Sequence, residues 1–135
     1  MRPIDARIIF NEELNLFSSI FNVSATAFVI ESRHFLDMAS DRDYAWAEIL
    51  TQASGAKQMS VHLIKRSLNL PEVNVRAIIR HELGHCSDDF VSMSGAEQRA
   101  DDIAQLVSGS RISYDNRLVQ TLGNGKYPRP SCLRS

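Results

Sequence analysis

Residues 71–85 read Pro-Glu-Val-Asn-Val-Arg-Ala-Ile-Ile-Arg-His-Glu-Leu-Gly-His. Pro71 suits the first position of a helix, because the N–H that proline lacks has no partner there in any case. Glu72 follows in the first turn, where a carboxylate complements the helix dipole. Apolar residues then recur at helical spacing, at Val75, Ile78, Ile79 and Leu83. The pattern predicts a helix over residues 71–87.

The chemistry-bearing residues of this helix are His81-Glu82-Leu83-Gly84-His85. Residues four apart lie on one face of a helix, so both imidazoles can reach one metal ion at about 2.0–2.1 Å. Glu82 then points beside the metal, where it can take a proton from bound water and pass it to a leaving group. Gly84 costs about 1 kcal/mol relative to alanine in a helix. Two explanations for a glycine at this position remain open. Either the helix tolerates the cost, or another backbone comes so close here that a side chain would not fit.

A third ligand should be a carboxylate, because no histidine follows His85. The best candidate is Glu97, in Glu97-Gln98-Arg99-Ala100-Asp101 on a second expected helix over residues 94–108. Asp101 lies one turn further on and could accept the outer N–H of a ligand histidine, which fixes its tautomer. Glu97 could instead belong to a capping box with Ser94, which needs no metal. The substitute ligands are, in order, Asp101, Asp88, Asp89 and Asp102.

Around this centre the sequence predicts a single α+β domain over residues 1–122. The further expected elements are a helix with Asn11 as its N-cap, a strand over 25–30, a helix from Ser40 or Asp41 to before Gly55, a strand over 58–65 and a short helix over 113–123. His62 is expected on a sheet face rather than at the metal. Residues 123–135, with their glycines and prolines, are expected to form a mobile or partner-bound tail.

Composition narrows the range of partners and locations. The chain has 135 residues, of which 44% are hydrophobic and 23% charged, enough for one compact core. The net charge of −1 gives no positive field for a nucleic acid backbone, so we predict no nucleic acid partner. No apolar run approaches the ~20 residues of a membrane span, and the first residues are too charged for a secretory signal. We therefore expect the chain to be cytoplasmic or virion-associated. In either place Cys86 and Cys132 are expected to be reduced thiols, with Cys86 packed in the core.

The two motifs resemble those of the zincin metallopeptidases, specifically the glutamate-ligand branch whose second motif is Glu-x-x-Ala-Asp. The short interval between them resembles compact ImmA/IrrE-type domains, and Val61 to His85 is similar to SprT-like domains. The chain lacks the third histidine of the latter and the sensory or DNA-binding domain of the former. The resemblance covers residues 57–108 and implies a minimal zincin-like α+β domain, with a small twisted sheet packed on the metal helix and a ligand-bearing helix after it. It also implies Zn²⁺ held by His81, His85 and Glu97, water activated by Glu82, and an edge strand at Gln58–Ile64 that pairs with an extended peptide.

The sequence therefore supports the hypothesis of a zinc-dependent endopeptidase acting on a protein or peptide substrate. The alternative is a catalytically silent, zinc-stabilised structural or interaction protein within a larger assembly such as a phage particle. In either case an assembly partner could bind the tail. A metal-free helical interaction protein is a third hypothesis, and it would be insensitive to chelators.

Overall fold

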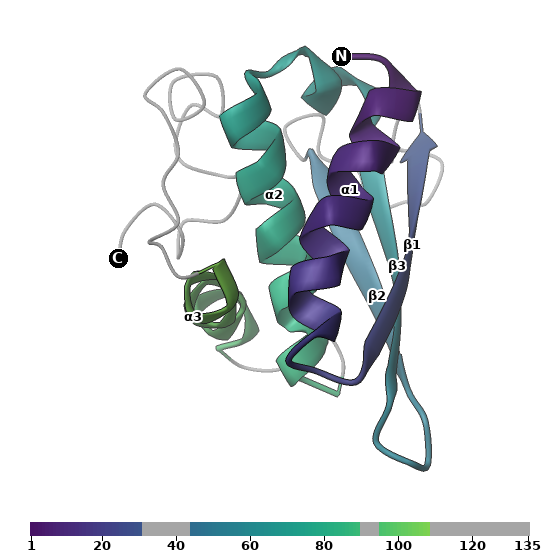
Figure 1. The fold of residues 1–135 in the computed structure, drawn as a ribbon, viewed down its shortest axis with the longest axis vertical. Coiled ribbons are helices and arrows are strands. Elements are labelled where there is room, and N and C mark those ends of the chain that lie inside the picture. The colour runs from purple at the N-terminus through teal and green to yellow at the C-terminus, as the bar shows by residue number, and fades with distance from the viewer. Residues whose placement is uncertain (31–43, 90–94, 109–135) are drawn as a thin grey trace.

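The computed structural model describes residues 1–30, 44–89 and 95–108. These residues form an α+β unit, as the sequence predicted. The elements are α1 (Pro3–Ser18), β1 (Val23–Ile30), β2 (Ala45–Thr51), β3 (Lys57–Ile64), α2 (Glu72–Gly84) and α3 (Ala96–Ser108), with the 3₁₀ turns η2 (Lys65–Asn69) and η3 (His85–Ser87). Figure 1 shows α1 and α2 on one face of the sheet, with α3 packed against α2. None of the described helices combines the length and apolarity needed to cross a membrane.

The three strands form a mixed sheet with the order β1-β3-β2. β1 runs parallel to β3, and β2 runs antiparallel to it. The prediction that Gln58–Ile64 is an edge strand is therefore wrong, because β3 is hydrogen-bonded on both sides and has no free edge for a peptide. Within the described residues, the outer edges of the sheet belong to β1 and β2.

The two faces of the sheet have different roles. On the helix-covered face, Ala27, Val61 and Ala47 form one buried row across the three strands. On the opposite face, Phe28, His62 and Trp46 form the corresponding row. The His62 ring stacks on Trp46 with ring centroids 4.4 Å apart and on Phe28 with centroids 5.2 Å apart. His62 is thus a sheet-face residue, as the sequence predicted.

The segment before Gly55 is a strand, which corrects the expected helix. Within β2, Ala45 and Ala47 point into the core while Trp46 and Glu48 point the other way. This alternation has the two-residue period of a strand. A tight turn joins β2 to β3, in which Gly55 has a φ of +89° that favours glycine. The expected cap residues Ser40 and Asp41 lie outside the described residues.

The first helix begins earlier than the sequence predicted. α1 starts at Pro3, so Asn11 lies inside the helix and is not its N-cap. Pro3 is compatible with the first helical position. The buried side of α1 also begins upstream of Asn11, and its members are Ala6, Ile9, Phe10, Glu13 and Phe17. The predicted strands are confirmed within two residues, as β1 and β3.

Several predictions fall on residues outside the described ranges. They are the helix over 113–123, the tail over 123–135, Ser94 and Cys132.

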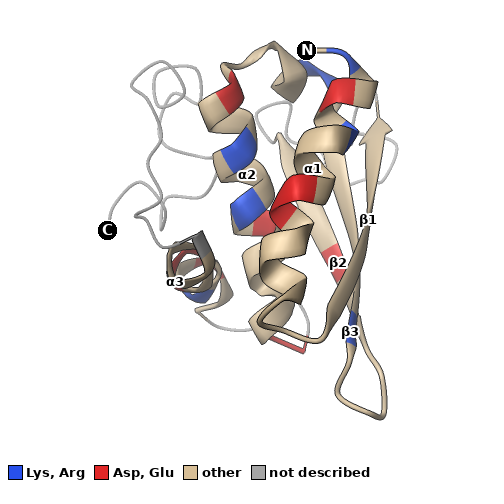
Figure 2. Ribbon diagram, viewed as in Figure 1, with Lys and Arg blue, Asp and Glu red and all other residues tan. Residues whose placement is uncertain are grey.

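A buried glutamate connects α1 to α2. The Glu13 side chain is 2% exposed and accepts hydrogen bonds from Arg76 Nη1 at 2.8 Å and from Arg80 Nε at 2.5 Å. Figure 2 shows the acidic position in the middle of α1 beside the basic positions of α2. Arg80 directly precedes His81, so these ion pairs hold the segment of α2 from which the histidines extend.

Replacing Glu13 should destabilise the fold far more than replacing its neighbour. In metal-free protein, Glu13→Gln is expected to lower the free energy of unfolding by about 2–4 kcal/mol, because two arginines lose a buried counter-ion. Glu12 pairs with the same Arg76 but is 56% exposed, so Glu12→Gln should cost less than about 1 kcal/mol. Urea unfolding of the two variants measures the difference, and equal losses would contradict this account.

Candidate metal centre

The two histidines lie at the C-terminal end of α2. Pro71 forms the N-cap, one position before the place predicted for it, and the α-helix ends at Gly84. His85 opens the 3₁₀ turn η3, so it lies just beyond the α-helix rather than within it. The two rings still lie together, with centroids 5.1 Å apart and planes at 86°. Both side chains are buried.

Two carboxylates of α3 complete the group. Glu97 Oε1 lies 2.9 Å from His81 Nε2, and Glu97 Oε2 lies 3.5 Å from His85 Nε2. Asp101, one turn further along α3, places Oδ1 2.7 Å from His81 Nδ1. Glu97 therefore reaches both imidazoles, while Asp101 contacts the other nitrogen of His81. The structure thus places Asp101 where the sequence predicted a residue that fixes the histidine tautomer.

A close approach of two backbones makes this arrangement possible. A Cβ atom added at Gly84 would lie 2.1 Å from the Ala100 carbonyl oxygen of α3, far inside van der Waals contact. Glycine is therefore required at this point for steric reasons, and of the two explanations offered for Gly84 the close approach is confirmed. Because Glu97 and Asp101 flank Ala100 on α3, the same contact brings both carboxylates to His81.

The donor set fits a divalent metal ion. One ligand atom from each of His81, His85 and Glu97 can be chosen so that all three lie within 4.8 Å of one another. Ligand atoms that lie about 2.0–2.2 Å from a tetrahedral zinc ion are about 3.4 Å from one another. Side-chain adjustments of about 1 Å would therefore bring these three residues into the geometry of a zinc site. Two imidazoles and one carboxylate are also the donor types that zinc binds.

His81 makes the strongest case for a cation at this place. A neutral imidazole has one N–H, so it can donate to only one of its two carboxylate neighbours. The second contact needs an additional cation, which is a proton on the ring or on the carboxyl group, or a metal ion bound by Nε2 and Glu97. On one side of the ring, Asp101 contacts Nδ1 inside the protein. On the other side, Glu97 contacts Nε2 and has a side chain that is one-third exposed. The Nε2 side is therefore the side at which an ion would bind.

The surroundings of His85 favour its neutral imidazole, which is the form that can bind a metal ion. Burial lowers the pKa of His85, against the opposing effect of the Glu82 carboxylate. The neutral ring has a lone pair to offer a metal near pH 7. Within the described residues, the buried Nδ1 of His85 has no hydrogen-bond partner. Cys86 is a buried thiol, as predicted, and burial raises its pKa to about 11, so it stays protonated and is a poor ligand.

Of the substitute ligands considered for the metal, Asp101 contacts Nδ1 of His81, and the other three are not grouped with the histidines. Asp88 is paired with Arg99 at 2.8 Å, Asp89 is paired with Lys57 at 2.9 Å, and Asp102 is exposed on α3. The capping-box alternative for Glu97 depends on Ser94, which lies outside the described residues. Among the carboxylates of the described ranges that were candidates, Glu97 is the one grouped with both histidines.

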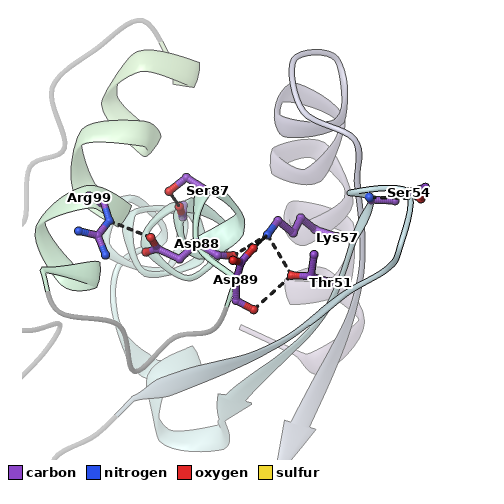
Figure 3. A network of polar contacts seen from close by, with 9 residues as sticks. Thr51, Ser54, Lys57, Ser87, Asp88, Asp89 and Arg99 are labelled. Carbon is purple, nitrogen blue, oxygen red and sulfur yellow. Dashed lines mark hydrogen bonds and ion pairs between the residues drawn. The ribbon is translucent and has the colours of Figure 1, made fainter.

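A polar network that no sequence pattern predicted holds the turn after the second histidine. Lys57 of β3 extends its ammonium to Thr51 Oγ1, to the Asp88 carbonyl and to the Asp89 carboxylate, at 2.9–3.0 Å (Figure 3). The Lys57 side chain is 14% exposed, so little water competes for these contacts. Lysine at the start of a strand carries no distinctive signal, because the same residue is common at exposed strand ends.

Comparison with protein-family models, with curated proteins and with solved structures yields no match to this chain.

Gly84→Ala tests the backbone contact. Helix propensity alone would make the variant more stable by about 1 kcal/mol. The overlap with Ala100 should instead make it less stable by about 1–3 kcal/mol and displace α3. Urea unfolding measures this, with Val73→Ala at an exposed position of α2 as a control whose effect should stay within about 0.5 kcal/mol. A stabilised Gly84→Ala protein would show that α3 does not pack as described.

Proposed function

We propose that the protein is a zinc-dependent metallopeptidase whose ion is held by His81, His85 and Glu97. The observation that carries the proposal is the position of Glu97, which lies against Nε2 of both histidines while Asp101 holds Nδ1 of His81. A carboxylate–histidine–metal arrangement of this kind orients the ring and raises its basicity as a ligand. The zincin-like fold suggested by the sequence motifs is part of the same proposal.

The residues around the ion would divide the chemistry between them. Zinc held there would supply Lewis acidity, which lowers the pKa of water to about 7 and polarises a substrate carbonyl. Glu82 is buried next to His81, and its carboxylate is the strongest charge acting on the His85 ring. From this place Glu82 would accept a proton as water attacks the peptide carbonyl. It would then return the proton to the amine nitrogen as the C–N bond breaks.

An extended peptide would need a different edge from the one expected from the sequence. β3 is the central strand, whereas β2 is paired on one side only within the described residues. β2 also contacts α2 and η3, which carry the histidines. We therefore propose that substrate adds to β2 through main-chain hydrogen bonds, which would align it beside the metal and give weak side-chain selectivity.

Zinc binding should depend on Glu97 more than on its neighbours. The wild-type protein is expected to bind one zinc ion per chain, and Glu97→Gln should weaken zinc affinity by more than about 100-fold, because a ligand is lost. Asp101→Asn should weaken it by about 10–100-fold, because only the support of His81 is altered. Asp102→Asn changes an exposed carboxylate of the same helix and should leave the affinity unchanged. Competition with a chromophoric chelator measures all three, and equal affinities would argue against the site.

Catalysis should depend on Glu82 without loss of the metal. With fluorescein-labelled casein as the probe, Glu82→Gln should lower the hydrolysis rate by about 100-fold or more while retaining zinc, because the proton acceptor is lost. A chelator should abolish wild-type hydrolysis, and added zinc should restore it. Wild-type protein that binds zinc but hydrolyses nothing would favour the alternative of a zinc-stabilised structural protein.

A further inference from the structure

One ion pair joins the turn after His85 to the helix that carries Glu97 and Asp101. Arg99 Nε donates a hydrogen bond to Asp88 Oδ1 at 2.8 Å (Figure 3). The Asp88 side chain is 5% exposed and that of Arg99 is 42% exposed. A carboxylate this deeply buried is costly unless it is paired. Separating α3 from the turn would therefore leave the Asp88 charge buried without its guanidinium.

The backbone around both members of this pair favours it. Gly95 has a φ of +74°, and a Cβ added there would lie 2.9 Å from Arg99 Nη1, so the absence of a side chain leaves room for the guanidinium. On the other side, the Asp88 carbonyl accepts a hydrogen bond from Lys57 Nζ at 2.9 Å. The pair thus links the start of α3 to the sheet through Lys57.

The interface between α2 and α3 needs such a fixed point. The buried residues that α3 presents at four-residue spacing are Ala96, Ala100 and Ala104, and Gly84 of α2 lies against Ala100. Small side chains allow the two backbones to come close, but they interlock little along the helix axis. A preorganised site holds its ligands within about 0.5 Å of the binding geometry, so a slide of α3 would add to the adjustment that Glu97 must make toward His81 and His85.

We propose that Asp88 and Arg99 are positioning residues for the third metal ligand. Their ion pair sets the position of α3 against the turn after His85, and so places Glu97 and Asp101 against the His81 ring. This assignment rests on the proposed function, since it concerns the same metal centre. Neither residue belongs to the donor group itself, and each acts through the helix or turn that carries a ligand.

The test separates metal affinity from fold stability in the full-length chain. Arg99→Met and Asp88→Asn are each expected to lower zinc affinity about 10–100-fold, measured by competition with a chromophoric chelator. Urea unfolding of the metal-free variants records any loss of stability separately. A purely structural role would lower that stability and leave the zinc affinity of the folded protein unchanged.

Two controls make the result specific. Gln98→Met changes an exposed residue beside Arg99 on α3 and should keep the wild-type zinc affinity. Leu68→Ala removes core packing in η2, before α2 begins, so it should lower stability and also keep the wild-type zinc affinity. Zinc affinity in Arg99→Met and Asp88→Asn equal to that of wild type overturns the assignment but leaves the proposed function intact. Wild-type protein that binds no zinc overturns both.

Discussion

The contact between the Gly84 backbone and the Ala100 carbonyl is the constraint on which the candidate site depends. A helix that carries two histidines cannot enclose a metal ion by itself, because a further ligand has to come from another element. Here that element is α3, and the absence of a single Cβ atom lets it come near enough for Glu97 to reach both imidazoles. The site therefore depends on sterics first and on electrostatics second.

Electrostatics then acts on an arrangement that packing has already set. His81 is fully buried between carboxylates at both ring nitrogens, which concentrates negative charge around Nε2 and Nδ1. Burial of His85 favours its neutral ring. Asp88 and Asp89 each pair with a cation, Asp88 with Arg99 and Asp89 with Lys57. The acidic residues of this region thus separate into a group that faces the histidines and a group that holds the turn.

Local patterns in the sequence were sufficient to predict the two helices that carry the candidate metal ligands and the central strand of the sheet. Helical spacing located α2 and α3, and strand alternation located β3. The errors have physical reasons: Asn11 followed by two glutamates imitates a helix start, yet Glu13 is buried against Arg76 and Arg80. In β2 the large residues Trp46, Ile49 and Leu50 have helical spacing, while small alanines face the core. The central place of β3 and the Asp88–Arg99 pair depend on contacts between distant segments, which no local pattern records.

The stack of Phe28, His62 and Trp46 lies on the face of the sheet opposite the helices. Trp46 is the single tryptophan of the chain, so the intrinsic fluorescence of the protein has one dominant source. That source is separated from the histidine pair by the thickness of the sheet and by the side chains packed beneath it. Emission from Trp46 is accordingly an optical reporter of how the three strands pack on the face of the sheet away from the histidine pair.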